Sequence, residues 1–259
     1  METLSTLLLG VLQGATEFLP ISSSAHLVIA QTLLKIQHPG LMVEIVLHLG
    51  TLVSVLVYFR RDLWQLAQGS LLRGRVGAAT RREVGYLGLA TVPAVVVALA
   101  LGDKIEAAFE DVHFSGMMLL VTTGVLVLSR WATRREGARM TWGMALVIGL
   151  AQSLAILPGI SRSGMTIVTG LWLGLKPEGA ARFSFLMAIP AILGAGIFQL
   201  LDLIHGPTVP VTGLVLGFLA AALVGYGMIA WLMDILRRGR LHLFAGYTLL
   251  AGLMVIFWW

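Results

Sequence analysis

Long apolar runs dominate the chain and are separated by short polar connections. Residues 84–102 and 211–233 are nearly continuous examples, close to the roughly 20 residues that a helix needs to cross a bilayer core. A water-soluble fold has no use for so much apolar surface. We therefore expect an all-α integral membrane protein, with spans at about 40–59, 84–102, 112–129, 183–203, 211–235 and 241–259.

Two further apolar segments are interrupted near their middle by polar and helix-breaking residues. Pro20 breaks residues 1–35, and Pro158 with Gly159 breaks residues 141–175. Each break leaves two half-helices that are too short to span a membrane. We predict that both segments are re-entrant hairpins, which enter the membrane and return to the same side.

The two interrupted segments are also copies of one another. Sliding the chain by 139 residues places Gln13 on Gln152 and Ser22 on Ser161, and sliding it by 130 places residues 114–120 on 244–250. We therefore expect two halves, 1–135 and 140–259, each with one re-entrant hairpin and three transmembrane helices. Because three is odd, the second half would be inverted relative to the first, and the two hairpin tips would meet near the midplane.

Charge distribution sets the expected orientation. Hydrophobic residues make up 58% of the 259 and charged residues only 12%, against roughly 25% charged in ordinary soluble domains. The connections 103–111 and 202–210 lack the basic excess of the others, so we place them outside. Three connections, which we place in the cytoplasm, hold the basic clusters: Arg60, Arg61, Arg73, Arg75, Arg81 and Arg82; Arg130, Arg134, Arg135 and Arg139; and Arg237, Arg238 and Arg240.

This distribution argues against two other interpretations. The net charge of +5 is explained by membrane topology, so we expect no nucleic-acid partner. A full crossing by residues 141–175 would place the basic residues 237–240 outside, which supports a re-entrant segment instead. The chain has no cysteine, which excludes disulfides and thiol nucleophiles.

The residues at the predicted tips suggest an anion site. A half-helix starts after each serine cluster, Ser22 to Ser24 and Ser161 to Ser163, and serine is a preferred helix N-cap. Two helix N-termini would then converge on one cavity, which favours phosphate. Arg162 adds a planar cationic fork and His26 a group that titrates near neutral pH. The serines alone would also serve simply to satisfy the broken backbone.

Glu17 does not fit a simple anion site, because a carboxylate repels an anion. It shares a helix face with Gln13, four residues earlier. Either a divalent cation bridges Glu17 and the anion, or Glu17 acts as a general base. Glu44 and His48, also four residues apart, would either pair with each other or line the same cavity. Arg182 is expected to be an interfacial anchor.

These motifs resemble those of the bacterial undecaprenyl-diphosphate phosphatase family, also called the bacitracin-resistance family. QGATEFLPISSSAH (13–26) is similar to its (Glu/Gln)-x-x-x-Glu signature and the serine-rich loop that follows, and PGISRSGMT (158–166) matches its PGxSRSxxT motif. The segment FSFLMAIP (183–190) is similar to a further family segment, so the resemblance covers essentially the whole chain.

The resemblance implies a multi-pass enzyme of the bacterial inner (plasma) membrane with a site open to the periplasmic side. Its substrate would be a polyprenyl diphosphate lipid, undecaprenyl diphosphate, which would lose one phosphate to regenerate the carrier lipid of peptidoglycan synthesis. Activity would depend on a divalent cation such as Mg²⁺ or Ca²⁺. The implied catalytic residues are Glu17, Ser23, His26 and Arg162, the implied metal ligands Glu17 and Gln13, and the implied substrate-binding residues Gln13, Ser22, Ser24, Ser161, Ser163 and Thr166.

Several alternatives stay open at this point. The attacking group is Ser23, His26 or a water, with Glu17 or His26 as the base. A transporter or flippase of an anionic lipid or small anion would share the inverted repeat and the broken helices. Small-residue helix faces would also permit a homodimer.

Overall fold

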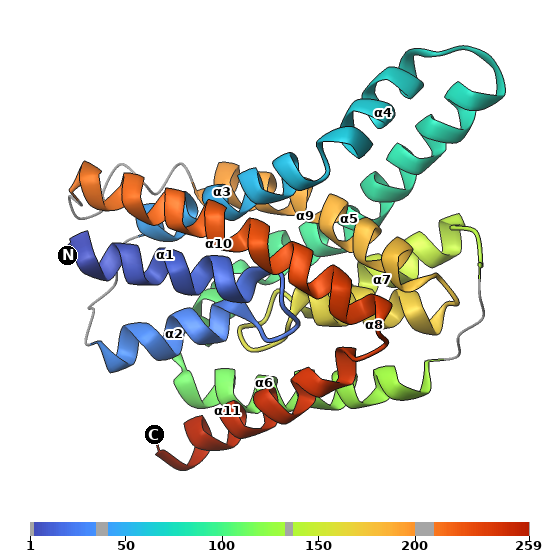
Figure 1. Cartoon of the computed structure of the whole chain (residues 1–259). Coiled ribbons are helices and arrows are strands. Elements are labelled where there is room, and N and C mark those ends of the chain that lie inside the picture. The colour runs from blue at the N-terminus through green and yellow to red at the C-terminus, as the bar shows by residue number, and fades with distance from the viewer. Residues whose placement is uncertain (1–2, 35–40, 133–136, 200–209, 259) are drawn as a thin grey trace.

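The computed structural model describes residues 3–34, 41–132, 137–199 and 210–258 (Figure 1). Within these ranges the chain forms helices and their connections, with no strand, which confirms the all-α class. The α-helices are α1 (Thr3–Glu17), α2 (Ser23–Leu33), α3 (Leu41–Tyr58), α4 (Arg60–Leu71), α5 (Gly74–Glu110), α6 (Val112–Leu128), α7 (Trp142–Leu154), α8 (Arg162–Trp172), α9 (Pro177–Gln199), α10 (Val211–Arg237) and α11 (Phe244–Trp258), and the short 3₁₀ helices are η1 (Ser129–Trp131) and η3 (Leu241–Leu243).

In the described part of the chain, five helical segments are long and apolar enough to cross a membrane: α5, α6 with η1, α9, α10, and η3 with α11. Helix α3 joins them as a sixth candidate, together with α4, which bends away from it by 72°. By contrast, α1, α2, α7 and α8 have 15, 11, 13 and 11 residues. At 1.5 Å per residue these reach only about 17–23 Å, less than a hydrocarbon core of roughly 30 Å. The protein is a multi-pass membrane protein that contains two pairs of short helices.

The two pairs of short helices pack on the long helices in the same way. Helix α1 lies along α10, where the backbone of Gly10 contacts that of Gly217. Helix α7 lies along α5, where a Cβ on Gly149 would come within 2.5 Å of the Ala90 carbonyl oxygen. Gly10 and Gly149 are 139 residues apart, the offset of the sequence repeat. The contacts are those that a repeat predicts; the inversion of one half relative to the other stays a prediction.

The connection that holds the first six arginines is a helical hairpin. Helix α4 and the first turns of α5 extend beyond the other helices, at the upper right of Figure 1. Gly74, at a φ of +82°, makes the turn between them. Arg182 of α9 forms ion pairs with Asp62 of α4 and Glu83 of α5. Arg182 therefore ties α9 to the base of this hairpin, which the sequence alone did not indicate.

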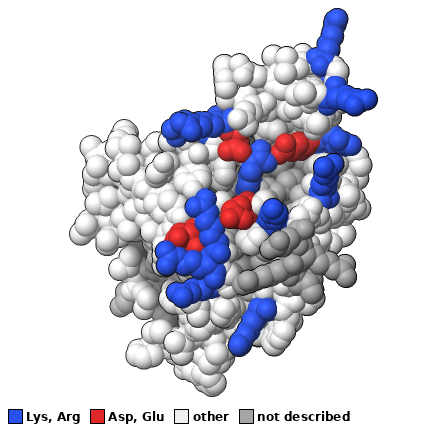
Figure 2. All heavy atoms as spheres, turned by 45° about the vertical axis from the view of Figure 1, so that its right-hand side comes forward, with Lys and Arg blue, Asp and Glu red and all other residues white. Residues whose placement is uncertain are grey.

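Lysine and arginine side chains gather on one face of the molecule (Figure 2). This face is formed where α4 meets α5, where α6 and α10 end, and where α7 begins. We call it the basic face. Its one-sided charge agrees with an orientation that places it in the cytoplasm. Of the basic and outer connections predicted above, Arg134, Arg135 and residues 202–209 lie outside the described residues.

Candidate active site

The tip of the first hairpin is a tight, strained turn between α1 and α2. Helix α1 ends at Glu17, and Ser22 caps α2 by accepting a hydrogen bond from the Ala25 N–H. Ser22 has a φ of +69°, which side chains other than glycine rarely adopt. Strain of this kind persists only where surrounding contacts hold it, and it occurs often at functional sites.

The second tip has the same construction, 139 residues later. Ser161 caps α8 by accepting from the Gly164 N–H at 3.1 Å. In both tips the capping serine also lies within hydrogen-bond distance of the serine two positions on, at 3.1 Å from Ser22 to Ser24 and 3.2 Å from Ser161 to Ser163. The repeated sequence thus forms a repeated local structure.

The two tips contact each other directly. The Gly159 N–H donates to Ser22 Oγ at 3.2 Å and lies 3.5 Å from Ser24 Oγ, and Ser163 Oγ donates to the Leu19 carbonyl at 3.1 Å. Thr122 of α6 completes the junction, since its hydroxyl donates to the Gly159 carbonyl and accepts from the Ser161 N–H. Three of the predicted serines, Ser22, Ser24 and Ser163, therefore join the hairpins to each other. The N-termini of α2 and α8 come together at this junction.

Glu17 lies beside this junction, 8% exposed, and accepts three hydrogen bonds. Gln13 Nε2 donates to its Oε2 at 3.0 Å, and Ser23 Oγ donates to the same oxygen at 2.6 Å. Arg162 Nη2 donates to Oε1 at 2.7 Å. The next residue, Phe18, packs edge-on against Phe185 with ring centroids 5.5 Å apart, which fixes the end of α1. The structure thus brings together Gln13, Glu17, Ser23 and Arg162.

Two buried polar atoms in this cluster have no hydrogen-bond partner among the described residues. One is Arg162 Nη1, a cationic donor, and the other is Gln13 Oε1, an acceptor. An unpaired buried polar atom costs free energy, about 1–3 kcal/mol and more for a charged group. A ligand or a water molecule at the site would pair them. The cationic donor suits a phosphate oxygen, and the amide oxygen suits a donor or a hard cation.

His26 lies on α2, and both of its ring nitrogens are engaged. Nδ1 lies 2.7 Å from the Ser22 carbonyl oxygen, which can only accept, so Nδ1 carries the proton. Nε2 of the neutral ring then accepts from the Tyr247 hydroxyl at 2.6 Å, and the two rings stack at 11°. The contacts of His26 thus hold the strained Ser22 and reach α11. They lead away from Glu17 and Ser23.

His48 of α3 is the histidine that faces Glu17. Its Nδ1 donates to the Glu44 carbonyl at 2.7 Å, while its Nε2 lies 3.9 Å from Glu17 Oε2. The side chain of Glu44 accepts from Gln31 at 3.0 Å instead of pairing with the His48 ring. Of the two alternatives for His48, the structure therefore favours a place beside the site.

Thr166 lies apart from the Glu17 cluster. Its hydroxyl contacts the Ser184 hydroxyl of α9 at 2.7 Å and donates to the Arg162 carbonyl of its own helix at 2.8 Å. Sequence reasoning did not single out Thr122 or Tyr247, which hold the second tip and His26. Both occur in apolar spans with no distinguishing pattern, so no signal in the sequence identified them.

Comparison with known proteins agrees with the geometry. Residues 6–254 match the family described as Bacitracin resistance protein BacA. A protein of Pelotomaculum thermopropionicum named undecaprenyl-diphosphatase is 42% identical over 261 residues, which cover 99% of this chain and 96% of that protein. A protein of Korarchaeum cryptofilum with the same name is 40% identical to this chain over 266 residues, which cover 99% of each protein. The chain therefore belongs to the bacitracin resistance protein BacA family.

Proposed function

We infer that this protein is a membrane phosphatase that hydrolyses undecaprenyl diphosphate to undecaprenyl phosphate and inorganic phosphate. Recycling of this carrier lipid would supply peptidoglycan synthesis and confer bacitracin resistance. The observation that carries the inference is the Glu17 cluster, in which a carboxylate, a hydroxyl and an arginine meet where two helix N-termini converge. Membership of the family and the names of the relatives supply the substrate.

The diphosphate would bind against Arg162 and the N-termini of α2 and α8. Arg162 uses Nη2 for Glu17 and has Nη1 without a partner, so one edge of the guanidinium is available to a phosphate oxygen. The backbone N–H groups at the start of each helix add positive partial charge. These donors are held in place before the substrate arrives, which is the condition for electrostatic stabilisation of a transition state.

Ser23 is the proposed nucleophile and Glu17 the proposed base. The Ser23 hydroxyl already donates to Glu17 at 2.6 Å, so its proton would pass to Oε2 as Ser23 Oγ bonds to the terminal phosphorus. The bond from that phosphorus to the bridging oxygen would break and release undecaprenyl phosphate. The proton held by Glu17 would leave with undecaprenyl phosphate. Water would then attack the phosphorus of phosphoserine and give a proton to the Glu17 carboxylate, the bond from phosphorus to Ser23 Oγ would break, and that proton would return to Ser23 Oγ as inorganic phosphate leaves. His26 is a weaker candidate for either role because Ser22 and Tyr247 occupy its nitrogens.

A divalent cation, Mg²⁺ or Ca²⁺, is part of the proposal. Among the described residues no group of three or more His, Asp or Glu side chains gathers to hold a metal. Mg²⁺ nevertheless binds to proteins through one or two carboxylates together with substrate phosphates. Glu17 and the unpartnered Gln13 Oε1 fit that pattern as oxygen ligands. When bound, the cation would neutralise charge on the phosphate oxygens.

Two wider features belong to the same proposal. The site would open to the periplasmic side, since the basic face is the expected cytoplasmic side.

A homodimer would use helix faces where glycines leave open space, as Gly88 and Gly227 do. Light scattering of the purified protein in detergent would give its oligomeric state.

The decisive experiment is phosphate release from undecaprenyl diphosphate by the purified protein, with Mg²⁺ and with EDTA. We expect release that depends on the metal and that falls by about 10² or more in Glu17→Gln. Glu106→Gln, an exposed carboxylate in the outer connection, is the matched control and should stay active. Folded wild-type protein that releases no phosphate would refute the enzyme and point to transport of an anionic lipid, which liposome assays would then test.

A further inference from the structure

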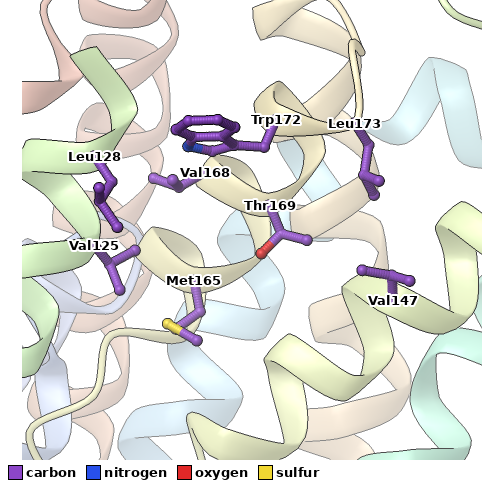
Figure 3. Close-up of a pocket in the computed structure, with 8 residues that line it drawn as sticks. All are labelled: Val125, Leu128, Val147, Met165, Val168, Thr169, Trp172 and Leu173. Carbon is purple, nitrogen blue, oxygen red and sulfur yellow. The ribbon is translucent and has the colours of Figure 1, made fainter. Parts of the chain in front are cut away.

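An apolar groove lies between α6, α7 and α8 (Figure 3). It encloses about 350 Å³ and is open along one side. Of its eight lining residues, Thr169 is the only one with a hydroxyl group. The walls of the groove include Val125 and Leu128 of α6 and Val147 of α7, and its floor includes Met165, Thr169 and Trp172 of α8.

The floor of the groove continues the face of α8 that begins in the candidate active site. Arg162 is the first residue of α8, and Met165, Thr169 and Trp172 follow at i+3, i+7 and i+10. Residues at these spacings lie along one side of a helix. Ten residues of helix correspond to about 15 Å. One side of α8 thus has the diphosphate-binding cation at its start and apolar side chains along the rest.

The α6 wall of the groove starts at the same place. Thr122 contacts the second tip through Gly159 and Ser161, and Val125 and Leu128 follow it at i+3 and i+6. Both the floor and this wall therefore begin within one helical turn of the hairpin tips. Helices α6 and α8 thus each lead from the hairpin tips into the lining of the groove.

We propose that this groove binds the polyprenyl chain of the diphosphate substrate. The inference rests on the proposed function and adds to it the place of the lipid tail. A lipid whose diphosphate reaches Arg162 must place its first isoprene units next to the tips. The groove is an apolar surface close to the tips, where the hydrocarbon of the tail would make van der Waals contacts with the lining side chains.

The direction of the groove agrees with the proposed opening of the site. The groove runs toward the C-terminal ends of α6 and α8, which lie at the basic face: Arg130 follows α6, and the Ala138 N–H donates to the Gly174 carbonyl just after α8. A lipid that enters head-first from the opposite side of the membrane would have its tail extending away from that side. The tail would then lie along the groove.

The test is to fill the groove and to vary the length of the tail. Thr169→Trp places a large side chain on the groove floor. Val127→Trp, on an exposed part of α6 outside the lining, is the matched control. We expect Thr169→Trp to raise the KM for undecaprenyl diphosphate roughly tenfold or more. The kcat/KM for dimethylallyl diphosphate, whose single isoprene unit ends near the tip, should be unchanged, and Val127→Trp should behave as the wild type with both.

In Thr169→Trp protein that is folded, loss of activity toward both substrates, or toward neither, would overturn the proposal. A second measurement covers the case in which Thr169→Trp fails to fold. Because the chain has no cysteine, Thr169→Cys creates a unique thiol in the groove. A non-hydrolysable undecaprenyl bisphosphonate should slow maleimide labelling of that thiol, and a short-chain bisphosphonate should not.

Equal protection by an ordinary phospholipid would make the groove a general lipid contact and refute a specific tail site. The two proposals fail separately. Wild-type protein that releases phosphate from neither diphosphate would refute the phosphatase, whereas active wild-type protein with no effect at Thr169 would refute only the groove.

Discussion

At the scale of single residues, the site depends on a buried carboxylate with several neutral donors and one cation. Glu17 accepts from Gln13 and Ser23 through one oxygen and from Arg162 through the other. Burial of a charge is tolerated when it is paired and hydrogen-bonded. The same contacts bring a hydroxyl, its proposed base and the proposed phosphate-binding cation together around one carboxylate.

Arg162 should be irreplaceable by lysine. Arg162→Lys keeps the positive charge but loses the planar fork that contacts Glu17 and a phosphate at once. We expect kcat/KM to fall about 10²-fold for Lys, and further for Ala, in steady-state phosphate release. Arg139→Lys, an exposed arginine of the basic connection, is the control. Near-normal activity of Arg162→Lys would show that charge alone suffices, contrary to the proposed role in which Arg162 contacts Glu17 and a phosphate oxygen together.

At the scale of elements, each hairpin tip contains one residue whose backbone φ angle is positive. Ser22 has a φ of +69° in the first tip, and Gly159 has a φ of +101° in the second. Contacts with the other tip and with α6 hold both turns. The two hairpins therefore stabilise each other's strained segment, and neither tip is an independent structure.

Gly159→Ala should damage the junction. A Cβ at this position would contact the Ser115 carbonyl and lie 2.5 Å from the Met118 side chain, in a backbone region that alanine disfavours. We expect a loss of roughly 1–3 kcal/mol in unfolding free energy, seen as a lower thermal midpoint in detergent, and a loss of activity. Gly143→Ala, where a Cβ meets open space in α7, should be neutral or slightly stabilising. Equal midpoints for both variants would contradict the strained-turn argument.

At the scale of the whole molecule, the charge on one face and the two pairs of short helices imply a definite orientation. The basic face carries the α4–α5 hairpin and the C-terminal end of α10 (Figure 2). Glu106 lies in the last turns of α5, which meet α6 at the opposite end of α5. An inverted repeat with two re-entrant hairpins would place the first group in the cytoplasm and the second outside.

Accessibility labelling tests this orientation directly. Gln68→Cys and Glu106→Cys each introduce one exposed thiol into a chain with none. In intact cells we expect a membrane-impermeant maleimide to label Glu106→Cys and to leave Gln68→Cys unlabelled until the membrane is opened. The reverse result would invert the orientation, and labelling of both before opening would contradict a sealed single topology.

Much of the architecture was predictable because it depends on local features. The length of an apolar run decides whether a helix can span a bilayer, and a proline or glycine within it breaks the helix, whatever lies nearby. The serine caps of α2 and α8 followed from the same local logic. The helical hairpin of α4 did not, because its 12 residues mix arginine with apolar residues in a segment too short to distinguish from a loop.

The membrane class, the places where helices break and the set of polar residues inside the membrane could be predicted from the sequence, because they depend on composition and spacing along the chain. Which of those residues meet became known from the folded structure. Arg162 pairs with a carboxylate 145 residues away, and His26 bonds to a tyrosine 221 residues away. His48 lies near Glu17, where His26 was expected. Contacts between distant segments depend on how helices pack, and no local pattern encodes that packing.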